Sequence, residues 1–303
     1  MKRINIHITE NQENILDSVS TLTGLPRSEI IREAINSYIS KSDAVSDVIE
    51  STPIKYVAAH KSVLTYIEQL IKTNNIDTGL VNTKLYDYQR ELITDIEKNS
   101  GVNNYLIHHS RQIGMTTVNQ AYVLAKSILT NNYKSILVAN KMTRAKYNMK
   151  DMVTKLEHIP SEARPGYKTR ASSIIFDNGS QIDFINEAGL GNYYGVSDIS
   201  FIYLDDAAFF KNYKQSSDLA KAITSNSWGI VVTTSSDTYH NHEFIKDCIE
   251  HSNSDKGTKY IEYPYTVIKN TGRDSQWVAN TIACIGMKRF ITEYCCRGGF
   301  INA

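Results

Sequence analysis

The chain has 303 residues, 41% of them hydrophobic, which is enough to bury one sizeable core and leave roughly 50 to 80 residues for a smaller unit, so a lone small domain is excluded. Its 33 Lys and Arg residues nearly balance its 32 Asp and Glu residues. This balance excludes a uniformly basic surface, so contacts with nucleic acid must come from local patches.

The cysteines indicate a reducing compartment. They form no CxxC pair, and the adjacent Cys295 and Cys296 are poorly placed to bridge to each other. Residues 1–30 lack the order of a signal peptide, and no stretch approaches the roughly 18 apolar residues of a membrane span. We therefore expect a soluble, cytoplasmic protein with no membrane partner.

The first residues predict a strand followed by two helices. Residues 1–8 alternate with period two, with isoleucines on one face and Arg3, Asn5 and His7 on the other. Two amphipathic helical runs follow, and the second begins after Pro26. A unit this short cannot close its own core, so we expect it to form a homodimer in which the strand pairs with its copy.

This order of elements resembles the ribbon-helix-helix family of DNA-binding proteins. In that family the paired strands enter the major groove, which by resemblance places Arg3, Asn5 and His7 at base edges of double-stranded DNA. The start of the second helix, at Arg27 and Ser28, would hold a DNA phosphate on its N–H groups. The alternative is that the segment only caps the larger domain with a strand and a helical hairpin.

We expect three parts in the chain: the DNA-binding module at residues 1–45, a linker and helix at 46–80, and the larger domain at 81–303. The linker is expected because residues 40–53 are polar and without periodicity. Residues 54–73 carry apolar side chains at helical spacing, which predicts a helix packed on the larger domain.

The larger domain is predicted to have an α/β fold. Short apolar runs alternate with amphipathic ones, which indicates a parallel sheet with helices on both faces. The turn sequence DNG at residues 177–179 predicts an inserted hairpin. The expected strands are apolar and lie at residues 105–108, 135–139, 201–204 and 230–233.

A candidate phosphate-binding loop follows the first of these strands. The run HSRQIGMTT begins at His109, contains Gly114 and ends in Thr116 and Thr117, where a helix opens. This is the context such a loop requires, because N–H groups at the start of a helix can surround a polyphosphate. The usual pattern GxxxxGK[ST] is broken, however, since His109 replaces the first Gly and Met115 replaces the Lys. The competing interpretation is an ordinary strand-to-helix turn.

Two aspartates and a glutamine lie where a nucleotide-binding site would need a carboxylate and an amide. A buried strand ends in Asp205 and Asp206, where a Walker B strand places one carboxylate that binds magnesium and one that orients water. The next strand ends in the hydroxyl-bearing run TTSS. Gln89 precedes the first strand, where several ATPases hold adenine.

In this order the motifs resemble the ATPase domain of large terminase subunits, the DNA-packaging motors of tailed phages, particularly of the contractile-tailed type. The resemblance covers residues 80–300 and rests on DYQRELI, SRQIGMTT, DNGSQI, IYLDDAAF and VVTTSS. It implies a P-loop NTPase fold that binds ATP with Mg²⁺. The residues it implicates are Gln89, Arg111, Gln112, Gly114, Met115, Thr116 and Thr117 for nucleotide, Thr116 and Asp205 for magnesium, Arg111 and Asp206 for catalysis, and Thr233, Thr234 and Ser235 for coupling hydrolysis to motion.

Three departures from that family predict weakened hydrolysis. Met115 cannot supply the positive charge that Lys places on the β and γ phosphates, although Arg111 would compensate in part. Asp206 replaces the more usual Glu and shortens the reach to water by one methylene. Tyr194 stands where many relatives have Arg, which removes a candidate arginine finger.

Two hypotheses for function follow. The first is a packaging ATPase in a phage-infected or prophage-bearing bacterium, which binds double-stranded DNA and assembles as a ring on a phage portal. The second is a non-hydrolysing DNA-binding regulator or assembly factor that keeps the terminase ATPase fold. A helicase-like remodeller comes last, because no series of later helicase motifs follows Ser236. Residues 287–303 are similar to the stretch that joins the ATPase and nuclease domains, so we expect no nuclease in this chain. Either another polypeptide supplies it, the gene is shortened, or DNA cutting is not this protein's task.

Overall fold

The computed structural model describes most of the chain after residue 61. The chain divides into two units, Met1–Ala59 and His60–Ala303. In the first unit the described residues are helical, and Arg27 forms an ion pair with Asp17. The predicted DNA contacts Arg3, Asn5, His7 and Ser28 lie outside the described residues. The described residues are 62–75, 79–98, 103–225, 227, 229–236, 242–252, 257–268 and 272–296, with Asp17, Ser20, Arg27, Ile30 and Ile31.

The described part of the second unit is built on an eight-stranded sheet in the order β10-β3-β9-β8-β4-β7-β6-β5. The six strands from β10 to β7 are parallel, and β6 and β5 continue the sheet antiparallel. The predicted parallel α/β sheet is therefore confirmed. The strands are β3 (Asn104–His109), β4 (Lys134–Ala139), β5 (Tyr167–Thr169), β6 (Ser173–Phe176), β7 (Gln181–Asn186), β8 (Ile199–Leu204), β9 (Ile230–Ser235) and β10 (Thr258–Tyr263).

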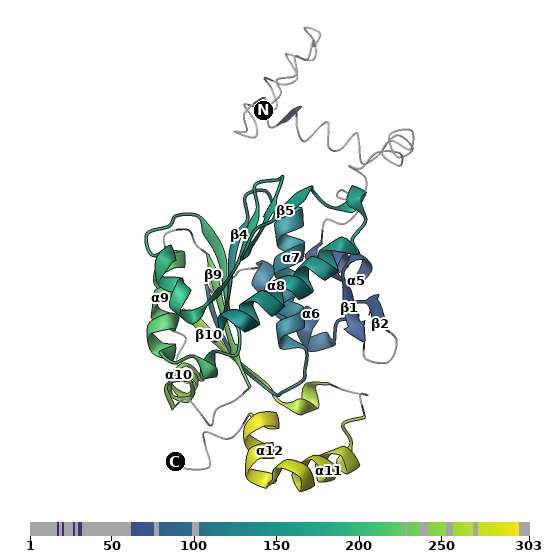
Figure 1. The fold of residues 1–303 in the computed structure, drawn as a ribbon, viewed down its shortest axis with the longest axis vertical. Helices are drawn as coiled ribbons and strands as arrows, with labels where there is room; N and C mark the ends of the chain where they lie inside the picture. The colour runs from purple at the N-terminus through teal and green to yellow at the C-terminus, as the bar shows by residue number, and fades with distance from the viewer. Residues whose placement is uncertain are drawn as a thin grey trace. The chain divides into compact units, whose positions relative to one another are not determined.

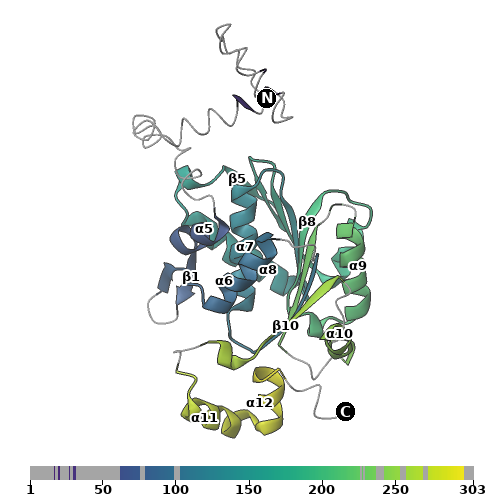
Figure 2. The same ribbon diagram turned by 180° about the vertical axis from the view of Figure 1, so that it is seen from behind.

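Helices cover both faces of the sheet, as Figures 1 and 2 show from opposite sides. Successive side chains of a strand point to opposite faces of the sheet. In β8, Phe201 and Tyr203 pack in the core on one face, while Ile202 and Leu204 pack in the core on the other. Both faces of the central strands are therefore apolar. The first core lies under α5 (Val63–Leu70), α6 (Asp87–Lys98), α7 (Met115–Leu129) and α8 (Met142–Glu157), and the second under α9 (Tyr213–Ser225) and α10 (His242–Ser252).

A small hairpin that the sequence analysis did not predict links α5 to α6. Its strands are β1 (Lys72–Asn75) and β2 (Gly79–Asn82), which pair antiparallel. Thr83 closes the hairpin, because its N–H and its hydroxyl both donate to the carbonyl of Ile71, at 2.9 and 2.8 Å. Short 3₁₀ turns complete the connections at η1 (Ser161–Ala163), η2 (Glu187–Tyr193), η3 (Ala207–Phe209) and η4 (Tyr265–Val267).

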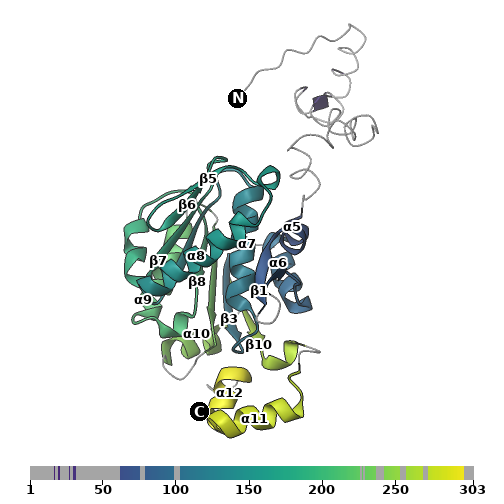
Figure 3. The ribbon, with the colours of Figure 1, turned by 45° about the vertical axis from the view of Figure 1, so that its right-hand side comes forward.

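Two C-terminal helices, α11 (Ser275–Ile285) and α12 (Met287–Tyr294), lie beyond the end of the sheet near β3 and β10 (Figure 3). They pack on each other through aromatic rings, with Trp277 of α11 against Phe290 and Tyr294 of α12 at centroid distances of 6.1 and 5.5 Å. Among the helices that the structure describes, none combines the length and the apolar character needed to cross a bilayer.

Candidate nucleotide site

The loop between β3 and α7 is shaped by two residues in the left-handed region. Gln112 has φ of 58° and Gly114 has φ of 82°. A side chain at Gly114 would be strained by that φ, and a Cβ there would lie 3.0 Å from Nε2 of Gln89. Gly114 is also the N-cap of α7 and has no side chain to cap the first turn. The N–H groups of that turn are therefore available to an anion.

From the α6 side, Tyr88 and Gln89 fasten the loop. The hydroxyl of Tyr88 donates to the carbonyl of Ile113, and Nε2 of Gln89 donates to the same carbonyl at 3.2 Å. Oε1 of Gln89 accepts from the N–H of Tyr86 at 3.1 Å. Gln89 lines the cavity described below, but both ends of its amide already have partners within the protein.

From the other side, the C-terminal segment that contains α11 and α12 holds the loop. The guanidinium of Arg273, just before α11, donates to the carbonyls of Arg111 and Gln112, the shorter contact being 2.8 Å to Gln112. The N–H of Arg111 donates to the carbonyl of Glu293 at 2.9 Å. The charged groups meet as well, since Nη1 of Arg111 lies 3.3 Å from Oε2 of Glu293, whose side chain is 7% exposed. Arg289 binds the other oxygen of Glu293.

Asp205, directly after β8, is the centre of a hydrogen-bond network. Its Oδ1 accepts from the hydroxyl of Thr116 at 2.8 Å and from the hydroxyl of Tyr203 at 2.7 Å. Its Oδ2 lies 3.5 Å from the amide nitrogen of Asn148 on α8. Because the single proton of Tyr203 is directed to Asp205, the hydroxyl of Thr234 is the donor in its 3.0 Å contact with Tyr203. Burial, followed by the charge of Asp205, raises the pKa of Tyr203 well above its ordinary value, so this donor keeps its proton.

Asp206 is the N-cap residue of η3, with φ of 52° in the left-handed region. It lines a cavity of about 250 Å³ together with Arg111, Asn140, Arg144, Asp205 and Phe209. The loop, the end of β4 and the end of β8 therefore meet at one edge of the sheet, as parallel strands require.

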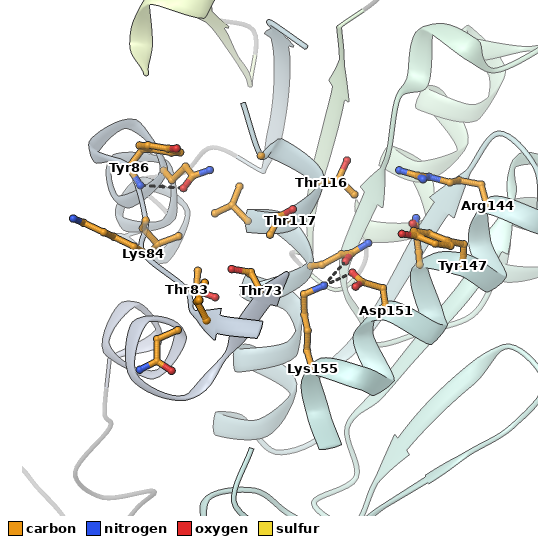
Figure 4. A pocket seen from close by; sticks show the side chains of 18 residues that line it. Thr73, Thr83, Lys84, Tyr86, Thr116, Thr117, Arg144, Tyr147, Asp151 and Lys155 are labelled. Carbon is orange, nitrogen blue, oxygen red and sulfur yellow. Dashed lines mark hydrogen bonds and ion pairs between the residues drawn. The ribbon is translucent and has the colours of Figure 1, made fainter. Parts of the chain in front are cut away.

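A larger cavity of about 530 Å³ adjoins the start of α7. Figure 4 shows Thr116 and Thr117 in its middle, with Lys84 and Tyr86 on one side and Arg144 and Tyr147 on the other. Gly114, Gln89 and Lys155 also line it. The volume falls in the range of small-molecule and cofactor sites.

The side chain of Met115 faces away from both cavities. It is 2% exposed and packs in the core under α7. The position that carries Lys in the usual motif thus contributes its backbone N–H at the helix start and no charge.

The three residues Thr233, Thr234 and Ser235 end β9, which lies between β3 and β8. All three are buried. Through the contact of Thr234 with Tyr203, this strand is connected to Asp205 by hydroxyl groups.

The histidines at the end of β3 are buried and neutral. Burial lowers the pKa of His108 to about 3, and burial also lowers the pKa of His109. Nδ1 of His109 lies 2.8 Å from the carbonyl of Ser110. Within the described residues, no group of three or more His, Cys, Asp and Glu side chains could hold a metal ion. A magnesium site needs no such group, because Mg²⁺ is commonly held by only one or two carboxylates together with phosphate oxygens and water. One Thr and one Asp beside a bound phosphate would therefore be enough.

One face of α8 carries polar residues that the sequence analysis missed. Arg144, Tyr147, Asn148, Asp151 and Lys155 recur at spacings of three and four, and all line the larger cavity. Lys155 is buried and contacts Asp151 and, at 3.4 Å, Gln120. A polar stripe at helical spacing was the available signal in the sequence.

A family model described as "Terminase large subunit, T4likevirus-type, N-terminal" matches residues 106–282, which is more than half of the chain. The match includes the loop, both acids and the polar face of α8.

Solved structures of phage large terminases share this fold. The Thermus phage P74-26 large terminase ATPase domain is 14% identical with a TM-score of 0.56, covering 70% of this chain and 93% of that one. The HK97 bacteriophage large terminase is 14% identical with a TM-score of 0.53, covering 71% and 46%. A large terminase from a thermophilic bacteriophage, in complex with ADP, is 13% identical with a TM-score of 0.51, covering 70% and 53%. The matched region therefore spans about half the length of the last two.

Proposed function

Since this chain belongs to the family of T4-like terminase large subunits, matching their N-terminal part, we propose that it binds ATP with Mg²⁺ at the carboxyl edge of β3 and β8 and hydrolyses it slowly. The observation that carries this proposal is the 2.8 Å contact between the hydroxyl of Thr116 and Oδ1 of Asp205. A terminase-like role in packaging phage DNA is the activity that such a site would drive.

The fit to magnesium is supported by the separation of these two oxygens. Adjacent ligands of an octahedral Mg²⁺ with bonds of about 2.0–2.1 Å lie roughly 2.9 Å apart. The 2.8 Å between Oγ1 of Thr116 and Oδ1 of Asp205 is close to that spacing. The ion would neutralise charge on the phosphates when bound.

The nucleotide is supported by the geometry at the start of α7 and by the thermophilic-phage terminase, which was crystallised with ADP. The loop from Arg111 to Gly114 and the first turn of α7, with Thr116 and Thr117, would bind the phosphates. The larger cavity beside Gln89 would take the base. Asp206 would orient the attacking water and accept its proton, while Arg111 would balance charge developing on the transferred phosphoryl group.

Slow hydrolysis is expected because the site has little positive charge to place on the phosphates. The buried Met115 adds none, and Arg111 is shared with Glu293. An uncompensated charge in the transition state of phosphoryl transfer is costly, because catalysis there is mainly positioning and electrostatics.

The partner assignments rest on the family and on the sequence. The proposed partners are double-stranded DNA and a phage portal, on which the protein would assemble as a ring. A ribbon-helix-helix-like module at residues 1–45 would form the dimer and bind DNA, and the protein would act in the cytoplasm of the bacterial host.

One observation favours a second function, a DNA-binding regulator or assembly factor that binds nucleotide without hydrolysis. Position 115, where the usual motif has a lysine, holds a methionine whose side chain is buried in the core and brings no charge to the site. The two functions differ in turnover.

The test uses the full chain and compares binding of a fluorescent ATP analogue in Mg²⁺ and in EDTA with phosphate release, each with and without plasmid DNA. Magnesium-dependent binding with slow, DNA-stimulated release supports the packaging ATPase. Binding without release selects the regulator. The absence of binding at millimolar nucleotide, with Asp205→Asn indistinguishable from the unmodified chain, would contradict both.

A further inference from the structure

We propose that Arg144 on α8 is a phosphate-binding residue that supplies, from a different helix, the positive charge that Met115 does not bring to the nucleotide. This inference rests on the proposed nucleotide site and assigns its polyphosphate contact to a residue outside the loop.

The first support is the position of Arg144 on its helix. Asn148 follows it by four residues and so lies on the same face of α8. The amide of Asn148 reaches Oδ2 of Asp205 at 3.5 Å. One turn closer to the start of the helix, Arg144 is therefore turned toward the acids at the end of β8.

The second support is the way the cavities adjoin. Arg144 lines the larger cavity beside Thr116 and also the smaller cavity that contains Asp205 and Asp206. It is the residue that the linings of these two cavities share. A nucleotide whose base occupies the larger cavity would carry its terminal phosphates toward this junction, where the proposed magnesium ligands also meet.

The third support is the availability of its charge. Among the residues that the structure describes, Arg144 takes part in no ion pair, and its guanidinium carbon lies 5.3 Å from the ring centroid of Tyr147. Arg111, which lines the smaller cavity, is paired with Glu293, and Lys155, which lines the larger one, is paired with Asp151. An exposed cation–π contact of this kind is weak, so it would hold the side chain near the site and release it to a phosphate.

The one further lysine that lines the larger cavity does not compete for this role. Lys84 lies across that cavity from Arg144, beside Tyr86 (Figure 4). The smaller cavity, which contains the two acids, is not lined by Lys84. Its charge would therefore face the base side of a nucleotide and not the terminal phosphates.

The chemistry fits an arginine. A guanidinium presents parallel N–H groups that match two phosphate oxygens, and charge-assisted bonds of this kind are roughly twice as strong as neutral ones. The neighbouring carboxylates Asp205 and Asp206 would repel a bare triphosphate. A cation here therefore favours the anion with the most charge, which predicts preference for ATP over ADP and little effect on adenosine.

The experiment measures dissociation constants of the full-length protein for MgATP, MgADP and adenosine by calorimetry. The variants are Arg144→Ala, Arg144→Lys and, as a matched control, Lys150→Ala, since Lys150 is an exposed cation of the same helix that lines neither cavity. Thermal unfolding checks that each variant folds, which the exposure of both positions favours.

Arg144→Ala is expected to weaken MgATP at least about ten-fold, the loss of one hydrogen bond to a charged group, to weaken MgADP less, and to leave adenosine unchanged. Arg144→Lys should fall between, and Lys150→Ala should bind as the unmodified protein does. If the unmodified protein binds MgATP and Arg144→Ala binds it equally well, or loses all three ligands alike, the assignment of Arg144 is wrong while the nucleotide site stands. If the unmodified protein binds no nucleotide, the site itself is wrong and the assignment with it.

Discussion

Thr116 and Asp205 lie 89 residues apart in the chain, and a hydrogen bond of 2.8 Å joins them. This bond connects the first turn of α7 to the end of β8, the two elements that a magnesium-nucleotide site must hold together.

Thr116→Ala removes the hydroxyl and is expected to weaken MgATP binding roughly ten-fold or more, because one of the two proposed magnesium ligands is lost. Thr116→Ser keeps the hydroxyl and should stay within a few-fold of the unmodified protein. Titration with and without Mg²⁺ measures the effect, and Thr154→Ala, a partly exposed threonine of α8 outside both cavities, is the control. Equal binding by the Ala and Ser variants would contradict the role of Thr116.

Met115→Lys restores the lysine of the usual phosphate-binding loop, but it places that lysine at a core position where the native side chain is 2% exposed. We expect it to lower the free energy of unfolding by roughly 3 kcal/mol or more, because it buries an unpaired charge. Met115→Leu should cost less than about 1.5 kcal/mol, as a swap of similar volume. Urea unfolding measures both. A Lys variant that keeps full stability and hydrolyses ATP faster would show that the lysine reaches the phosphates after all.

Glu293→Gln removes a buried carboxylate that pairs with Arg111. We expect MgATP to bind about three- to ten-fold more tightly, since a nearby negative charge is lost and Arg111 no longer has an anionic partner. Calorimetry at two salt concentrations measures the gain. Glu250→Gln on α10, which removes an exposed acid that pairs with Lys246, is the control and should bind nucleotide unchanged. Weaker binding in Glu293→Gln would mean that Glu293 is needed to position the loop.

The burial of His108 makes stability depend on pH. Its pKa is about 3 in the folded protein, below its ordinary value of 6.5, so the unfolded chain takes up the proton first on acidification. The stabilisation is therefore complete above pH 6.5 and is lost as pH falls toward 3, by up to about 1.4 kcal/mol per pH unit. His108→Leu should make the fall between about pH 7 and pH 5 shallower. Urea unfolding at several pH values measures it, with the exposed His158→Gln as control. An unchanged slope in His108→Leu would show that His108 is not the group responsible.

The sequence was informative where the signal is local. An apolar strand, a tight loop and a helix opening in Thr116 follow one another directly, and β8 ends in Asp205. The alternation of strands and helices predicted a parallel sheet, and a parallel sheet brings such ends to one edge. The proximity of Thr116 and Asp205 could therefore be predicted from the sequence.

The remaining features depend on packing between distant segments. Arg273 and Glu293 bind loop residues that lie about 160 to 180 positions earlier in the chain. Nothing in the sequence from Arg273 to the end of α12 indicates that these residues contact the loop. The orientation of Met115 depends on how α7 is rotated about its axis. The polar face of α8 was visible as a spacing, but its direction toward Asp205 was not. The DNA contacts at residues 1–45 and the site roles stay predictions.

The backbone at Asp206 constrains which substitutions are accessible there in evolution. Its φ of 52° lies in a region that Asp and Asn enter more easily than Glu. A change to Glu would lengthen the side chain, but it would also place that longer side chain on a left-handed backbone at a cost of about 1 kcal/mol. A lineage gaining faster turnover would thus have to reshape the turn after β8 together with the acid. In a library randomised at position 206 and selected for folding alone, we therefore expect Asn to be recovered ahead of Glu.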